Sequence, residues 1–152
     1  MLEKLLSDAC QILGVEPKED EQDQSIRIVD LDAFSLKFKL VPDSDRICVS
    51  ACLCELTPVQ RDRILELVLV YNTQSFQSGG MRLVLIENDA LVMHNDLRAV
   101  AWDAEKLAKF VLAFADVSAG WLKIVREMGA QAEASSDDLT QDTFEPATLI
   151  SL

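Results

Sequence analysis

Three of the four cysteines, Cys48, Cys52 and Cys54, lie close together in the sequence, and His94 is the only histidine. Thiolates and imidazole are ligands of zinc, and a cysteine beside a histidine can also act as a nucleophile. The spacing C-x3-C-x-C differs from the paired C-x2–4-C knuckles that are typical of structural zinc. Because these cysteines lie in an apolar segment, where free cysteine behaves as a small hydrophobic residue, we expect core packing rather than metal binding.

His94 also lies in an apolar segment, which favours a structural role over catalysis. The sequence contains neither a G-x-S-x-G motif nor a local cysteine-protease signature. The pair Gly79-Gly80 joins a predicted helix to a predicted strand, whereas a phosphate cradle joins a strand to a helix, so we expect a turn. We therefore predict no catalytic residues, no metal, no cofactor and no enzyme activity.

Length and charge exclude several classes of protein. The chain has 152 residues, enough for one domain, and 49% of them are hydrophobic. Its formal net charge of −12 repels phosphate backbones and anionic membrane surfaces, which argues against nucleic acid and membranes as partners. Apolar runs are too short to cross a membrane, and the first residues lack the pattern of a secretory signal, so we expect no membrane insertion and a cytoplasmic protein.

The hydrophobic periodicity predicts an α+β fold. Helical spacing in the first segment ends at Gly14, and Thr57-Pro58-Val59-Gln60 has the residues of a capping box. Short links favour antiparallel pairing, so we expect a twisted antiparallel sheet covered by helices. The expected helices span 2–13, 57–76 and 103–128, the expected strands span 26–31, 34–41, 46–56, 81–86 and 90–97, and 16–24 is an acidic loop.

The composition changes after Gly129, and we divide the chain there. Residues 1–129 form the predicted domain, and residues 130–152 contain acidic side chains but neither Lys nor Arg. We expect this second segment to be a flexible acidic tail. Its apolar residues, Phe144, Leu149, Ile150 and Leu152, leave the alternative that the tail lies in a groove.

The second predicted helix is apolar over more of its circumference than one sheet can cover. Its apolar arc is roughly 200°, whereas a helix that covers a sheet needs roughly 100°. One interpretation is a helix sunk in the core of a monomer. We prefer that one apolar patch covers the sheet while the other contacts a second subunit. One patch consists of Ile64, Leu67, Val68 and Tyr71, and the other consists of Leu65, Leu69 and Phe76, with Asn72 between them.

The order of these elements resembles that of the class I type III secretion chaperones of the Tir-chaperone (CesT) type. The similarity covers residues 2–128, and its core is the Leu-rich helix 65–72 that ends in Asn72, followed by Gly79-Gly80 and the apolar strand 81–85. Two departures are Cys54-Glu55, near a position where family members often have glycine, and the long acidic tail. The tail puts in doubt how far the C-terminal region behaves as in the family.

The resemblance implies a homodimer in the bacterial cytoplasm that acts as an ATP-independent chaperone. It would bind the N-terminal segment of a secreted effector and keep it soluble and export-competent, with the ATPase of the secretion system as a further partner left open. The alternative is an adaptor or regulatory protein of the same fold. On this sequence we assign the dimer interface to Ile64, Leu67, Val68 and Tyr71. We assign effector binding to Leu5, Leu6, Ile28, Phe34, Leu36 and Phe38, several of which must be core residues instead.

Overall fold

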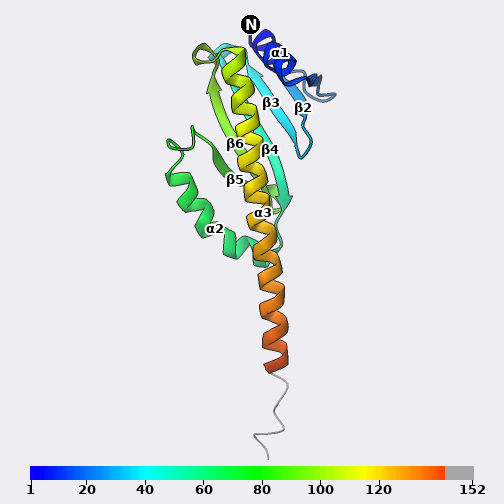
Figure 1. Ribbon diagram of the computed structural model, residues 1–152, viewed down its shortest axis with the longest axis vertical. Helices are drawn as coiled ribbons and strands as arrows, with labels where there is room; N and C mark the ends of the chain where they lie inside the picture. Colours follow the sequence, from blue (N-terminus) through cyan, green and yellow to red (C-terminus); the bar gives the residue numbers. More distant parts are fainter. Residues whose placement is uncertain (143–152) are drawn as a thin grey trace, which may run out of the picture.

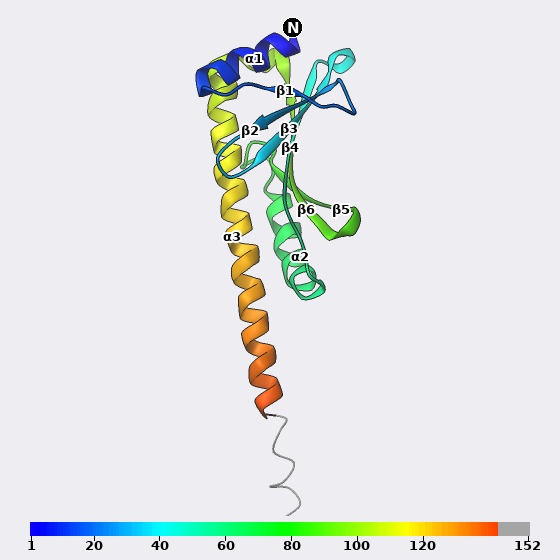
Figure 2. The same ribbon diagram turned by 90° about the vertical axis from the view of Figure 1, so that its right-hand side faces the viewer.

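The structure, a computed structural model, describes the backbone of residues 1–142 and the side chains of residues 1–131. Within these residues an antiparallel sheet of six strands has helices α1 and α3 on one face (Figures 1 and 2). Helix α1 (Leu2–Leu13) ends as predicted at Gly14, whose φ of 73° is a backbone conformation that glycine adopts without strain. The predicted α+β class and order of elements are confirmed.

The first part of the sheet is a run of neighbouring antiparallel strands. These strands are β1 (Lys18–Glu19), β2 (Ile26–Asp30), β3 (Ser35–Val41) and β4 (Arg46–Glu55). The sequence predicts only a loop at residues 16–24, but Lys18 and Glu19 pair with β2, and Lys18 Nζ lies 3.2 Å from Asp30 Oδ2. A short 3₁₀ turn, Pro42–Ser44, links β3 to β4 at the predicted position.

The second part of the sheet follows helix α2 (Pro58–Thr73). Strand β5 (Arg82–Ile86) is linked through a 3₁₀ turn, Glu87–Asp89, to β6 (Ala90–Arg98). The strand order is β1-β2-β3-β4-β6-β5, so β6 lies between β4 and β5, and β5 forms an edge. Helix α2 starts at the predicted capping box but ends at Thr73 rather than near Phe76.

Helix α3 (Ala104–Asp142) is longer than predicted and projects beyond the sheet (Figure 1). It follows a 3₁₀ turn, Ala99–Ala101, and Asp103 Oδ1 accepts a hydrogen bond from the Lys106 amide at 2.8 Å. The predicted end near Gly129 is wrong, because the helix continues to Asp142. The glycine serves close packing instead, since a Cβ atom at this position would lie 2.6 Å from Gln60 Nε2. Gly129 thus lets α2 approach α3. The division into 1–129 and a separate tail stays a prediction, and Phe144, Leu149, Ile150 and Leu152 lie outside the described residues.

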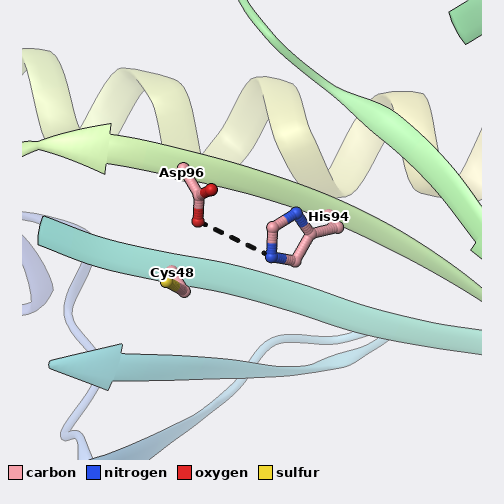
Figure 3. Close-up of side chains that lie close together, drawn as sticks. All are labelled: Cys48, His94 and Asp96. Atoms are coloured by element: carbon pink, nitrogen blue, oxygen red, sulfur yellow. Dashed lines mark ion pairs between the residues drawn. The ribbon is translucent and has the colours of Figure 1, made fainter. Parts of the chain in front are cut away.

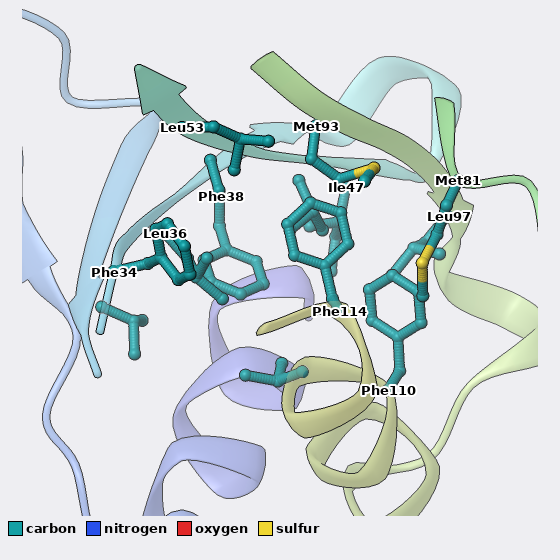
Figure 4. Packing of buried hydrophobic residues seen from close by; sticks show 14 of the residues in the cluster. Phe34, Leu36, Phe38, Ile47, Leu53, Met81, Met93, Leu97, Phe110 and Phe114 are labelled. Atoms are coloured by element: carbon teal, nitrogen blue, oxygen red, sulfur yellow. The ribbon is translucent and has the colours of Figure 1, made fainter. Parts of the chain in front are cut away.

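The hydrophobic core lies between the sheet and the helices on its covered face. Figure 4 shows Phe38 of β3, Ile47 of β4 and Met93 of β6 facing Phe114 of α3. The rings of Phe110 and Phe114 are tilted by 42° to each other, with their centroids 5.7 Å apart. Each fully buried side chain of this size contributes about 1.5–3 kcal/mol. Since the strands alternate, the side chains between these inward residues lie on the opposite face of the sheet.

Candidate functional site

Helix α2 is held at its start by contacts with the rest of the protomer. Thr57 Oγ1 accepts a hydrogen bond from the Gln60 amide at 3.2 Å, and Gln60 Oε1 accepts one from the Thr57 amide at 3.0 Å. Gln60 Nε2 also donates to the Val125 carbonyl of α3 at 3.4 Å. Arg61 forms an ion pair with Asp89 at 3.0 Å. These contacts fix which side of α2 faces the core.

The side of α2 that faces the core carries most of the predicted dimer patch. Ile64 is fully buried and Val68 is 6% exposed, so neither offers a surface to a second subunit in this conformation. The Tyr71 ring packs edge-on against Trp121 with centroids 5.0 Å apart. Leu67, 39% exposed, is the most accessible of the four. The protein's own core covers Ile64 and Val68 in this conformation, and their assignment to a dimer interface stays a prediction.

The opposite side of α2 exposes large apolar side chains among charged ones. Leu69 is 67% exposed, and Phe76, just after the helix, is 81% exposed. Helix α2 packs along β5, whose Val84 and Ile86 are also exposed. We define the α2–β5 surface as these four residues together with Leu67 and Val70. The accessible surface therefore includes Leu69 and Phe76 of the second apolar patch, but only Leu67 of the first.

Two asparagines fix the position of the α2–β5 surface. The Asn72 side chain donates to the Leu83 carbonyl at 2.8 Å and accepts from the Leu83 amide at 2.9 Å. It therefore pairs with the edge of β5 as another strand would. Buried Asn95 of β6 donates to the Gly79 carbonyl at 3.0 Å, which holds the connection from α2 to β5.

The six predicted effector-binding residues divide by burial. Leu6, Leu36 and Phe38 are at most 1% exposed and belong to the core, so they are not accessible to a partner in this structure. Leu5 and Ile28 are partly exposed. Phe34 is 8% exposed and borders a cavity. The structure thus brings Leu6, Leu36 and Phe38 into one core cluster rather than into a surface groove.

The cavity beside Phe34 lies where β4 extends beyond its pairing with β3. Strand β4 pairs with β3 only from Arg46 to Ser50, but with β6 from Arg46 to Glu55. The cavity has a volume of about 480 Å³. We call it the β4 notch, and it is lined by Ala33, Phe34, Ser35, Lys37, Ser50, Cys52, Leu53, Ile86, Val92, Leu122 and Arg126. Of the predicted effector-binding residues only Phe34 lines this site, because strand lengths alone do not show where one strand extends beyond its neighbour.

None of the three clustered cysteines is fully buried in the core. The inward side chains of β4 are Ile47, Val49, Ala51 and Leu53, whereas Cys48 and Cys54 are partly exposed and Cys52 is exposed. The prediction of core packing is therefore wrong for Cys48 and Cys52, whereas Cys54 packs against the core and Cys10 is buried within it. The alternation of larger apolar residues with Cys48, Ser50 and Cys52 was the signal that could have shown this.

Cys48 lies beside His94 and Asp96 on the uncovered face of the sheet (Figure 3). Burial, together with a hydrogen bond to the Asp96 carboxylate, raises the pKa of the Cys48 thiol to about 11. The thiol is therefore protonated near neutral pH, which is the opposite of an activated nucleophile. This arrangement does not favour a Cys–His catalytic pair.

Among residues 1–142, none of the helices combines the length and apolar character that a membrane span requires. The sequence matches the model of the Tir chaperone protein (CesT) family over residues 4–122. A search of the curated proteins found no match.

Thirteen chains of solved structures match this chain, and they include the following three. The HopA1–SchA chaperone–effector complex contains a chain with a TM-score of 0.63 and 15% identity, covering 80% of this chain and 93% of that one. The type III secretion chaperone SycH of Yersinia pestis, solved with a fragment of YscM2, has a TM-score of 0.63 and 19% identity, covering 79% and 98%. YbjN from E. coli, a candidate transcription regulator, has a TM-score of 0.56 and 20% identity, covering 87% and 93%. At these identities the likeness shows the fold alone.

Proposed function

Because the chain belongs to the Tir chaperone protein (CesT) family, we propose that it is an ATP-independent chaperone for a type III secreted effector. It binds the N-terminal segment of that effector in the bacterial cytoplasm and keeps it soluble and export-competent. The observation that carries this proposal is a family match over residues 4–122 in a protein that presents an apolar surface and an unpaired strand segment. The protein acts by binding and not as an enzyme.

The α2–β5 surface is the proposed contact between two copies of the chain. Leu69 and Phe76 are exposed on α2 and just after it, and Ile86 is 54% exposed on β5. Exposed apolar side chains of this size favour aggregation of a monomer, whereas a symmetric dimer buries them on both copies. The proposed dimer interface therefore keeps helix α2, as the sequence suggests, but uses Leu69 and Phe76 in place of Ile64 and Val68.

The β4 notch is the proposed entry point for an extended effector segment. Beyond Ser50, the side of β4 next to β3 is not paired with β3, so a peptide strand can pair there and continue the line of β3. Alternate side chains of such a strand reach Phe34 and Leu53 on one side. Lys37 and Arg126 at the rim favour a segment with acidic or polar residues between its apolar ones.

Strand pairing at the β4 notch explains how the chaperone works without ATP. Main-chain hydrogen bonds supply affinity without requiring one particular sequence, and the apolar lining selects side chains at alternate positions. The bound segment stays extended, which suits export through a narrow channel. Contact with the secretion-system ATPase is a further part of the proposal.

The proposal is tested by co-expressing the full chain with the products of neighbouring genes. We expect one product to co-purify through its N-terminal region, equally well with ATP and after ATP is removed. Cys52→Arg, which places a charge at an exposed position of the notch, should lose the partner while the chaperone stays folded and dimeric. Leu112→Arg is the matched control, because Leu112 is an exposed leucine of α3 that does not line the notch. A partner that binds only through a folded domain would support the adaptor alternative instead.

A further inference from the structure

The pairing of β4 with β6 brings three potential metal ligands together on the uncovered face of the sheet. Cys48 lies directly opposite Asp96, and His94 lies two residues before Asp96 and therefore on the same face. One potential ligand atom from each residue lies within 4.8 Å of the other two. His94 Nε2 and Asp96 Oδ1 are 3.7 Å apart, and Cys48 lies beside them (Figure 3).

The three donor atoms have the chemistry and spacing of a zinc site. Zinc is bound tetrahedrally by thiolate, imidazole and carboxylate, and its bond lengths place neighbouring ligand atoms about 3.5 Å apart. The His94–Asp96 separation of 3.7 Å is close to this value, and the Cys48 sulfur lies within 4.8 Å of a ligand atom of each of the other two residues. His94 and Asp96 side chains are 29% and 33% exposed, so an ion can reach them from solvent.

We propose that Cys48, His94 and Asp96 bind zinc or another divalent transition ion, with water as the fourth ligand. On binding, the Cys48 thiol releases its proton to solvent, and its sulfur forms a bond to the ion. Thiolate, carboxylate and neutral imidazole together carry two negative charges, which balance a divalent cation. The site joins β4 to β6 and is independent of the proposed chaperone function.

The surroundings of the site determine which ions it accepts. Arg82 Nη2 lies 3.5 Å from Asp96 Oδ2, which leaves Oδ1 directed toward His94. The positive charges of Lys39 and Arg46 also lie near Cys48, and Lys39 is its cross-strand neighbour on β3. Because these cations repel a metal ion, binding requires the strong bond to the thiolate sulfur. Mg²⁺ and Ca²⁺, which prefer oxygen ligands, should therefore not bind.

The test is a titration of the full chain, without a histidine tag and in reducing buffer, with Co²⁺ and then Zn²⁺. We expect one equivalent of Co²⁺ to give a sulfur-to-cobalt charge-transfer band, Zn²⁺ to displace it, and Mg²⁺ to have no effect. The melting temperature should rise with Zn²⁺ concentration, because the ion binds the folded state. Absence of the charge-transfer band in the wild-type protein would overturn the proposal.

Variants separate this site from the other cysteines. Cys48→Ser should abolish the band, and His94→Gln and Asp96→Asn should each weaken binding by about 10-fold or more, since even second-shell changes have effects of this size. Cys52→Ser is the matched control, because Cys52 lies on the same face of β4 but outside the cluster. A band that persists in Cys48→Ser and is lost in Cys52→Ser would contradict the assignment. If Cys48→Ser does not fold, His94→Gln and Asp96→Asn provide the same comparison.

Discussion

Asn72 of α2 and Leu83 of β5 form a pair of hydrogen bonds. The side-chain amide of Asn72 pairs with the backbone of Leu83 as a neighbouring strand would. Both bonds are short, at 2.8 and 2.9 Å, and both involve the backbone of Leu83. An edge strand with free backbone groups is open to unintended pairing. Asn72 blocks that edge at one residue and at the same time fixes α2 beside β5.

Replacement of Asn72 by Ala should therefore destabilise the fold. The Leu83 amide and carbonyl both lose their partner, and we expect a loss of about 1–3 kcal/mol in the free energy of unfolding. Urea denaturation followed by circular dichroism measures this loss. Gln74→Ala, which changes an exposed residue just after the helix, is the control and should have little effect. Equal stability of Asn72→Ala and the wild type would show that the two bonds are not important.

The glycine pair after α2 gives a second prediction. A Cβ atom at Gly80 would lie 2.9 Å from Asn95 Oδ1, and the φ of this residue is +90°, so Gly80→Ala should cost about 1–3 kcal/mol. Gly79 has a φ of +74° but open space around it. Gly79→Ala should therefore lower the melting temperature less than Gly80→Ala does. The reverse order would contradict the role of Asn95 in holding this turn.

The two sides of α2 should respond differently to mutation. Ile64→Ala removes a buried side chain and should cost about 2–5 kcal/mol of stability without changing the oligomeric state. Leu69→Glu changes an exposed side chain and should convert the proposed dimer to a folded monomer. Light scattering coupled to size exclusion distinguishes these results. A wild-type protein that elutes as a stable monomer would remove the dimer proposal.

Local signals in the sequence predicted much of the fold. The capping residues Thr57 and Gln60 and the stop at Gly14 act within one turn of a helix, so their effect does not depend on the rest of the chain. The end of α3 was missed because Gly129 has a tertiary role, in which it makes room for Gln60 of α2. A glycine in a sequence does not show whether it ends a helix or permits close packing.

The α2–β5 surface was harder to predict, because its position depends on which of the two apolar patches of α2 faces the core. A helical wheel shows that α2 is apolar on both sides, but contacts such as Tyr71 with Trp121 decide the orientation. Phe34 was the one predicted effector residue that borders the notch. Leu36 and Phe38 continue the alternation of apolar and polar residues that begins at Phe34. They lie farther along β3, where α1 and α3 cover them.

Acid pH should weaken the contacts of Asp30 on β2 with Lys18 on β1 and Ser35 on β3. Hydrogen bonds from Ser35 and from Lys18 hold the pKa of Asp30 below its usual range. A lowered pKa contributes stability above the unfolded-state pKa, and this contribution is lost as the pH falls through the folded-state value. Ser35→Ala should raise the pKa of Asp30, which NMR titration of the carboxylate measures. An unchanged pKa would show that the 2.6 Å bond from Ser35 Oγ has no effect on Asp30.

The most direct test of the proposed function is limited proteolysis of the complex between the chaperone and a full-length effector, with the fragments identified by mass spectrometry. We predict that the chaperone protects one fragment near the effector's N-terminus, that the pattern is the same with and without ATP, and that Cys52→Arg removes the protection. Protection of a folded C-terminal domain alone, or no protected fragment with any product of the neighbouring genes, would contradict the chaperone proposal.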